Sequence, residues 1–303
     1  AFPFMKKLYE IVILALVTPL NKNNTADLLG LDKIIEHLNN KECNKFVLFG
    51  TSGEFSLINE SVKSSILNHL KLKSNSNKFI IACNSENYDD LDYKLKKYEK
   101  YDFVEGYLVA PPYYFNLTQK ELFSFYKKIL NIVNKPILYY NIPQLTGISL
   151  DINTIVNLSN LGIFGIKDSS GDISFLNKLT TFKKLKNEFK IYVGGSRILL
   201  QALNMGIDGV IGLGSNINPK LEIDLINFFN EKNYKKALDQ QILCDKHNEF
   251  LNNYPYFQQS IAKGILSKMH IIKKHVCFPK QELDKQNTSL IYNEYIKLFG
   301  KIT

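Results

Sequence analysis

The sequence predicts an α/β fold, a (β/α)8 TIM barrel with a C-terminal helical extension. Short apolar runs alternate about eight times with longer helical patterns, which is typical of parallel βα units. The length of 303 residues fits one such barrel with an added segment. We expect residues 5–230, from the plausible start at Met5, to form the barrel. Residues 231–303 are expected to pack on it as an extension and not as an independent domain.

The expected strands are short apolar runs bounded by polar, proline or glycine-containing turns. In chain order they are Ile11–Val17, Phe46–Phe49, Phe79–Cys83, Gly106–Val109, Pro136–Tyr140, Ile163–Lys167, Ile191–Val193 and Gly209–Gly212. Thr18 and Pro19 close the first run, because a proline cannot continue a central strand. The carboxyl ends of these strands are expected to line the mouth of the barrel, where barrel enzymes carry their working residues.

Between the strands, apolar residues recur at three-and-four spacing, which predicts amphipathic helices. Examples in chain order are Leu28–Leu38, Glu60–Leu70, Tyr88–Lys100, Gln119–Val133 and Leu199–Met205. After the eighth strand, Pro219 is suited to open a helix. The extension is expected to hold helices at Tyr234–Leu251, Gln258–Met269 and Leu290–Phe299.

Composition excludes several classes of protein. Hydrophobic residues make up 45% of the chain and charged residues 22%, which excludes a disordered protein. No apolar stretch reaches the roughly 20 residues of a membrane span, so no membrane partner is expected. The formal charge of +9 comes from lysines spread along amphipathic segments and not from an arginine-rich patch, so nucleic-acid binding is not expected.

The cysteines and the first residues together predict a reduced, cytoplasmic protein. The four cysteines are widely spaced and form no CxxC pair. Residues 5–17 imitate a secretory signal, with lysines before an apolar run. Glu10 interrupts this pattern, and no small-residue cleavage site follows, so we expect no signal peptide.

Lys167 carries the most informative functional signal, because it ends the short apolar run that begins at Ile163. An amine at the tip of a buried strand lies near apolar walls, where desolvation disfavours the ammonium and favours the neutral nucleophile. That form of lysine makes Schiff bases with ketones. The alternative is a strand-end lysine whose amine simply reaches solvent.

Other strand ends are also polar. The second strand runs into Gly50–Glu54, a turn whose backbone N–H groups and hydroxyls suit a carboxylate. The fourth ends in Tyr113 and Tyr114, and the fifth in Tyr139 and Tyr140. The alternatives are an ordinary turn and ordinary aromatic packing. At one mouth, however, an amine, a phenol and a hydroxyl turn suit a carbinolamine mechanism, in which a phenol held by a threonine hydroxyl moves protons. All five histidines fall on helical or C-terminal segments, so no metal site is implied.

These motifs, in this order, resemble the dihydrodipicolinate synthase / N-acetylneuraminate lyase family of pyruvate-dependent class I aldolases, over nearly the whole chain. The matching pieces are Gly50–Glu54, Pro112-Tyr113-Tyr114, Tyr140-Asn141-Ile142-Pro143 with Thr146-Gly147, Gly165-Ile166-Lys167-Asp168 and Gly206-Ile207-Asp208-Gly209. The family fold is the barrel predicted above.

The resemblance implies a role for several residues. Lys167 would form the Schiff base with pyruvate, with no further cofactor, and Tyr140 would move the proton. Thr51 with Ser52 would hold the pyruvate carboxylate. The residues expected to bind substrate also include Gly53, Ile211, Leu145 and Arg197. Tyr114 would match the family tyrosine that reaches a neighbouring subunit's site, which implies a homotetramer built as a dimer of dimers.

Departures from the family pattern bear on the second substrate. Dihydrodipicolinate synthases carry an arginine two residues after the motif proline, where this chain has Leu145. Aldolases for phosphorylated sugar acids carry an arginine where this chain has Asn116, so a substrate without phosphate is favoured. Sialate lyases place acidic residues just after the seventh strand's glycine, whereas here Gly194 leads to Arg197. Arg197, the only arginine, is suited to clamp a carboxylate or hydroxyl of the second substrate; the alternative is a solvated arginine that opens the next helix.

The sequence therefore favours a lyase, a class I aldolase that reversibly cleaves a 2-keto-3-deoxy sugar acid of the 2-keto-3-deoxygluconate type to pyruvate and an aldehyde. The enzymatic alternatives are dihydrodipicolinate synthase without the usual arginine and N-acetylneuraminate lyase. A catalytically idle, pyruvate-binding regulatory barrel is the non-enzyme alternative. Retention of both Lys167 and Tyr140 argues against idleness, because binding alone needs neither a nucleophile nor a proton shuttle.

Overall fold

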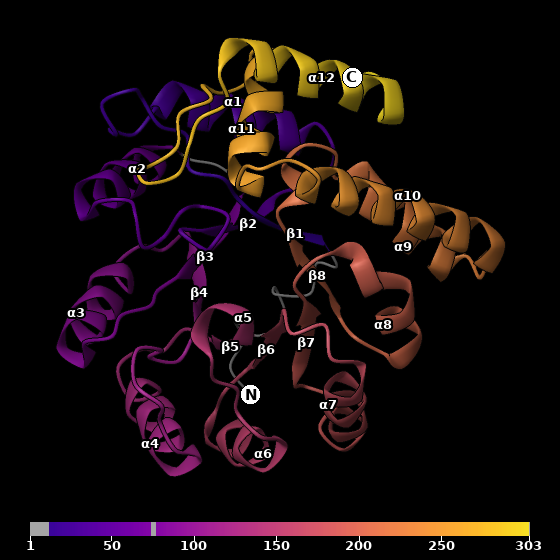
Figure 1. Cartoon of the computed structure of the whole chain (residues 1–303). Coiled ribbons are helices and arrows are strands. Elements are labelled where there is room, and N and C mark those ends of the chain that lie inside the picture. The colour runs from indigo at the N-terminus through magenta and orange to yellow at the C-terminus, as the bar shows by residue number, and fades with distance from the viewer. Residues whose placement is uncertain (1–11, 74–76, 303) are drawn as a thin grey trace. The chain divides into compact units, whose positions relative to one another are not determined.

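The eight strands form a closed barrel in sequence order, and helices alternate with them (Figure 1). The computed structural model describes residues 12–73 and 77–302. The strands are β1 (Val12–Ala15), β2 (Lys45–Leu48), β3 (Lys78–Ala82), β4 (Val104–Val109), β5 (Ile137–Asn141), β6 (Gly165–Asp168), β7 (Lys190–Val193) and β8 (Gly209–Gly212). Parallel pairing joins β1 to β2, and it joins β3 to β4, β4 to β5, β5 to β6, β6 to β7 and β7 to β8. The predicted TIM barrel is confirmed; Met5 and Ile11 lie outside the described residues.

The barrel helices begin close to where the apolar spacing predicts. They are α1 (Leu28–Asn39), α2 (Glu60–Leu72), α3 (Tyr88–Tyr98), α4 (Gln119–Ile129), α5 (Pro143–Thr146), α6 (Ile152–Leu161), α7 (Ile173–Leu185) and α8 (Leu199–Met205). Side chains cap several of them: Asp27 accepts the N–H of Gly30, and Thr118 forms a capping box with Glu121. Helix α4 ends four residues before the expected Val133, because i to i+3 hydrogen bonds at Asn131 and Ile132 close its last turn.

The C-terminal helices are α9 (Lys220–Asn230), α10 (Tyr234–Asn252), α11 (Gln258–Lys268) and α12 (Lys285–Phe299). Pro219 precedes α9 as expected. Helix α12 starts five residues earlier than Leu290, because the carboxylate of Asp284 accepts the backbone N–H of Asn287 and caps the helix there. The apolar spacing alone starts only at Leu290, so this N-terminus was missed.

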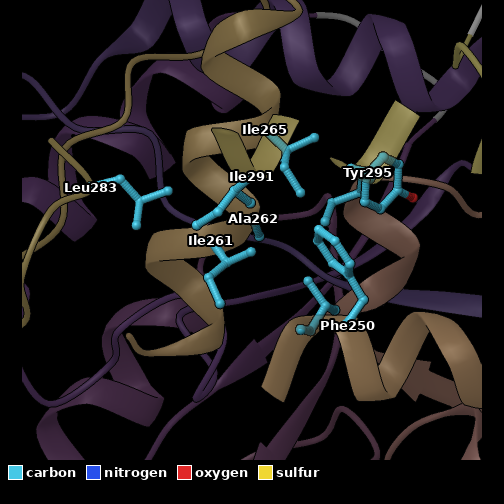
Figure 2. Close-up of a cluster of buried hydrophobic side chains, with 9 residues drawn as sticks. Phe250, Ile261, Ala262, Ile265, Leu283, Ile291 and Tyr295 are labelled. Carbon is cyan, nitrogen blue, oxygen red and sulfur yellow. The ribbon is translucent and has the colours of Figure 1, made fainter. Parts of the chain in front are cut away.

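The described chain divides into two compact units, residues 78–211 and residues 12–77 with 212–302. In the second unit, α10, α11 and α12 share a hydrophobic core that Figure 2 shows. Its fully buried members include Ile261, Ala262 and Ile265 from α11 and Tyr295 from α12, and Phe250 of α10 packs against Tyr295 with ring centroids 5.4 Å apart. The division at residue 230 between barrel and extension stays a prediction.

His247 on α10 lies beside this core, with its ring centroid 5.6 Å from that of Tyr295. Its side chain is buried, and among the described residues no hydrogen-bond partner meets its Nε2. Burial lowers the pKa of His247 from 6.5 to about 4. The folded protein therefore holds this ring neutral, while the unfolded chain takes up a proton as the pH falls.

We expect the contribution of His247 to the free energy of unfolding to be fully present above about pH 6.5. This contribution should be lost as the pH falls toward 4, which lowers the free energy of unfolding by about 3 kcal/mol in total. Urea unfolding at several pH values across this range measures how the free energy of unfolding changes with pH. His247→Leu has no proton to take up there and should remove this part of the pH dependence. An unchanged slope in the variant would contradict the assignment.

The described residues also bear on membrane-spanning helices and on the state of the cysteines. None of their helices is both long and apolar enough to cross a membrane. All four cysteines are buried thiols outside any disulfide.

Candidate active site

The ends of β5 and β6 bring Lys167 and Tyr140 together. The two strands pair in parallel with Tyr140 opposite Lys167, so both side chains point to the same face. The Lys167 Nζ lies 4.4 Å from the centroid of the Tyr140 ring. Only 6% of Lys167 and 3% of Tyr140 is exposed. The site therefore pairs a buried amine with a phenol, which is a nucleophile beside a group able to carry a proton.

On the opposite face of the same two strands, a polar network joins the strand ends. The side-chain amide N–H of Asn141 donates to the Asp168 carboxylate at 2.7 Å, and the hydroxyl of Tyr139 donates to the side-chain oxygen Oδ1 of Asn141 at 2.8 Å. The N–H and hydroxyl of Ser170 also donate to Asp168, at 3.1 and 3.0 Å. Burial raises the pKa of Asp168, and these hydrogen bonds oppose that rise. Because Asn141 and Asp168 are the strand neighbours of Tyr140 and Lys167, the network holds the reactive pair in register.

The loop after β5 carries Leu145 on the short helix α5, and 61% of Leu145 is exposed. The hydroxyl of Thr146 donates to the carbonyls of Ile142 and Ile148 and closes this turn. Gly147 ends the helix at φ 66°, the left-handed region that glycine enters without steric cost. This explains the paired threonine and glycine of the motif as turn chemistry.

The seventh strand ends at a close backbone contact. A Cβ on Gly194 would lie 1.8 Å from the Ser169 hydroxyl oxygen, so only glycine fits beside the loop that follows β6. Arg197 follows on a single turn of 3₁₀ helix, Ser196–Ile198, and is exposed. Ile211 on β8 is fully buried.

Tyr114 lies in the loop after β4 and is 78% exposed. The carboxylate of Glu86 accepts the backbone N–H groups of Tyr113 and Tyr114 at 2.8 and 3.0 Å and so holds this loop. The Phe115 ring lies edge-on to Tyr114, with ring centroids 5.2 Å apart. Glu86 was not singled out from the sequence, because nothing in the spacing indicates which carboxylate reaches this loop.

Thr51, Ser52 and Gly53 belong to the other unit and follow β2. Two residues with left-handed backbones flank them, Phe49 at φ 59° and Glu54 at φ 63°. Such a conformation costs a residue other than glycine about 1–2 kcal/mol. A contact from another part of the chain supports this turn, since the Thr18 hydroxyl donates to the Gly53 carbonyl at 2.8 Å. Strain of this kind concentrates at functional sites.

The sequence-predicted residues thus fall into two groups. Within residues 78–211 the structure brings Lys167 and Tyr140 into contact and places Tyr114, Leu145 and Arg197 at exposed positions. Thr51, Ser52 and Gly53 form one turn in the unit that contains β1 and β2. Among the described residues no group of three or more His, Cys, Asp or Glu side chains is arranged to hold a metal ion. The expectation of a site without metal or other cofactor stays a prediction.

Comparison with known proteins places these features in a family. The model of the "Dihydrodipicolinate synthetase family" matches residues 9–289. The chain belongs to this family. It is a lyase of the pyruvate-dependent class I aldolase type, and the resemblance stated from its motifs is confirmed.

Several relatives and solved structures are similar to this family member. A 4-hydroxy-tetrahydrodipicolinate synthase of Karelsulcia muelleri is 33% identical over 93% of this chain and 95% of its own. Another, of Oceanobacillus iheyensis, is 30% identical over 80% and 83%. A monomeric dihydrodipicolinate synthase variant superposes with a TM-score of 0.87 at 23% identity, over 97% of this chain and 98% of its own. A 2-keto-3-deoxygluconate aldolase variant of Sulfolobus solfataricus has a TM-score of 0.83 at 22% identity, over 95% and 96%.

Proposed function

We propose that this aldolase is a 4-hydroxy-tetrahydrodipicolinate synthase. The observation that carries the proposal is the similarity to synthases of that name, at 30–33% identity over 80–93% of the chain. The 2-keto-3-deoxygluconate aldolase is similar only at 22% identity, which supports the shared fold. The motifs of the sequence favoured the sugar-acid aldolase over the synthase, and the similarity to known proteins reverses that ranking.

The proposed chemistry follows from the amine and the phenol at the strand ends. The Lys167 amine adds to the pyruvate ketone, and the resulting carbinolamine loses water to give an imine. Loss of a C3 proton then gives an enamine whose C3 attacks the aldehyde of the second substrate. In this proposal Tyr140 carries the protons for these steps, and its contact with Lys167 Nζ supports that role.

The second substrate follows from the product. The product, 4-hydroxy-tetrahydrodipicolinate, has seven carbons, and pyruvate supplies three of them. The other four come from an amino acid that carries an aldehyde, aspartate 4-semialdehyde. After the new carbon–carbon bond forms, its amino group attacks the imine carbon, which closes the ring and releases Lys167.

One observation favours a second candidate, cleavage of a 2-keto-3-deoxy sugar acid. Leu145, 61% exposed, stands where the family's synthases carry an arginine for the carboxylate of the second substrate. A leucine there offers no hydrogen bond to a carboxylate. If this chain is a synthase, Arg197 is the residue we propose for that carboxylate, because it is exposed directly after β7.

A substrate panel decides between the two. We expect pyruvate to be consumed with aspartate 4-semialdehyde, with kcat/KM at least about tenfold above that for pyruvate release from 2-keto-3-deoxygluconate, a difference of about 1.4 kcal/mol in transition-state binding. Liquid chromatography with mass spectrometry measures both reactions, and N-acetylneuraminate is tested alongside. Faster cleavage of either sugar acid would replace the proposal, and no turnover with any of the three would favour the idle, pyruvate-binding barrel.

The assembly and the location of the protein stay predictions. A homotetramer is supported by the exposed aromatic residues Tyr114 and Phe115, which are 78% and 72% exposed in the single chain. The proposal of a cytoplasmic location rests on the wide spacing of the four cysteines along the sequence, which form no CxxC pair.

A further inference from the structure

Glu54 ends the Thr51–Gly53 turn with a backbone that glycine would adopt more easily, at φ 63°. Its side chain is nevertheless completely buried. A glutamate at such a position is explained by what its carboxylate contacts and not by the backbone.

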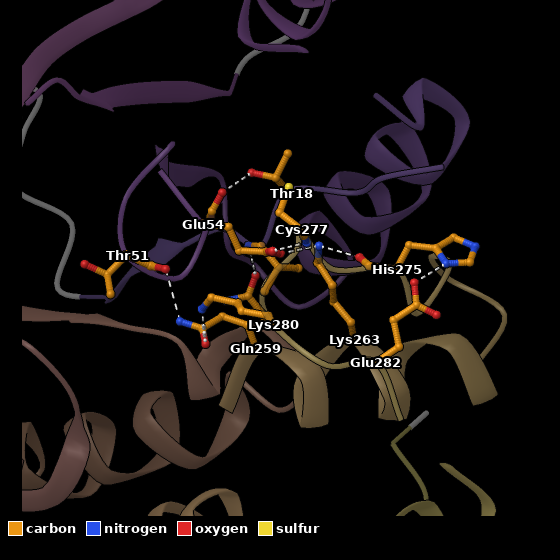
Figure 3. Close-up of polar contacts among 12 residues, drawn as sticks. Thr18, Thr51, Glu54, Gln259, Lys263, His275, Cys277, Lys280 and Glu282 are labelled. Carbon is orange, nitrogen blue, oxygen red and sulfur yellow. Dashed lines mark hydrogen bonds and ion pairs between the residues drawn. The ribbon is translucent and has the colours of Figure 1, made fainter. Parts of the chain in front are cut away.

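The carboxylate of Glu54 is held by the C-terminal segment (Figure 3). Its Oε1 accepts from Lys263 Nζ on α11 at 2.5 Å, and its Oε2 accepts the backbone N–H of Cys277 at 2.7 Å. Lys263 also donates to the His275 carbonyl at 2.8 Å. Burial lowers the pKa of Lys263, and the Glu54 carboxylate opposes that change. A buried pair of this geometry holds both partners in one place.

A second contact reaches the other end of the same turn. The Gln259 side-chain amide donates to the Thr51 backbone carbonyl at 3.0 Å, and Lys280 donates to the side-chain oxygen Oε1 of Gln259 at 2.9 Å. Gln259 and Lys263 are four residues apart, so they lie on one face of α11. One helix face therefore binds both ends of the turn.

These contacts use the hydrogen-bond acceptors of the turn. The Thr51 and Gly53 carbonyls and the Glu54 carboxylate are all bonded. By contrast, the backbone N–H groups of Ser52 and Gly53 meet no acceptor within residues 12–73 and 77–302. Two adjacent N–H groups left over in a turn make a site for an anion.

We propose that Glu54 is a positioning residue, which through its ion pair with Lys263 holds the Thr51–Gly53 backbone in the conformation that receives the pyruvate carboxylate. This inference rests on the proposed function, in which Lys167 forms an imine with pyruvate. The C-terminal segment then contributes to substrate binding through α11 without touching substrate.

The test compares two ketones that differ in the carboxylate. Borohydride traps the imine of Lys167, and mass spectrometry follows the rate of trapping with pyruvate and with acetone. In Glu54→Gln we expect the rate ratio of pyruvate to acetone to fall by about tenfold to a hundredfold, because the turn is displaced while the amine is not. Saturating pyruvate should restore most of the wild-type adduct.

Further variants keep the test decisive if Glu54→Gln does not fold. The double variant Glu54→Gln/Lys263→Met removes both buried charges, and Thr18→Val removes only the hydrogen bond to Gly53; both should lower the same ratio. The matched control is His275→Asn/Glu282→Gln, which breaks a more exposed ion pair in the same segment and leaves the Glu54–Lys263 pair intact. Its ratio should match the wild type.

If the variants lost trapping rate equally with pyruvate and with acetone, the role of Glu54 would be merely structural and the proposal would be overturned. Variants whose trapping rates and rate ratio both match the wild type would overturn it as well. A wild-type protein that traps no pyruvate would instead overturn the proposed function and this inference with it. The two failures are distinct, because the first appears only in the variants and the second already in the wild type.

Discussion

Lys167→Ala is expected to abolish the pyruvate adduct and to lower kcat by about 10⁴-fold or more, because it removes the amine to which the proposal assigns the imine. Reduction of the imine with borohydride adds roughly 72 Da to the wild-type protein, and intact-protein mass spectrometry should find no such addition in the variant. The fold should survive, since an alanine fits the strand end and leaves the Asn141–Asp168 network in place.

Lys178→Ala is the matched control for this experiment, because Lys178 is exposed on α7, the helix that follows the same strand. The control should trap pyruvate as the wild type does. An adduct that persists in Lys167→Ala would mean that another lysine reacts, and the assignment of the nucleophile would be wrong.

Lys263→Met is expected to destabilise the protein by about 3–5 kcal/mol, because it leaves the Glu54 carboxylate buried with its cation removed. The midpoint of urea unfolding measures this loss. The double variant Glu54→Gln/Lys263→Met should recover most of the stability, since it removes the unpaired charge and leaves an oxygen for the Cys277 N–H.

Lys273→Met is the control for that comparison. Lys273 pairs with Asp27 at 3.5 Å, but its side chain is 54% exposed, so water screens the pair and little stability should be lost. If Lys263→Met unfolded at the same urea concentration as this control, the buried pair would contribute nothing to stability. A double variant no more stable than Lys263→Met would show that the loss comes from packing.

The reactive pair could be predicted from the sequence because its signals are local. A short apolar run that ends in a lysine, and another that ends in paired tyrosines, indicate where two strands stop. In a parallel barrel those ends meet at one edge, so Lys167 and Tyr140 were expected at the same mouth, and the structure pairs them directly through β5 and β6. The first residue of a helix was predicted equally well where the apolar spacing begins next to the capping residue, as at Gln119 after Thr118.

The second substrate could be predicted less well. Leu145, one position in an exposed loop, favoured the sugar-acid aldolase, whereas similarity across most of the chain favours the synthases. A single side chain at a loop tip shows which contact is missing, and it does not show which other residue replaces that contact. Arg197 is such a residue, and only the substrate panel tests it.

By itself, then, the sequence determined the alternation of strands and helices, the barrel, and the amine and phenol at the strand ends, because each depends on periodicity or on residues close together in the chain. Only the tertiary structure showed what holds the Thr51–Gly53 turn. Glu54 and Lys263 are 209 residues apart, and one of many lysines in the chain reaches that carboxylate. No local pattern identifies that lysine, because the choice depends on how the chain packs Gln259 and Lys263 of α11 against the turn.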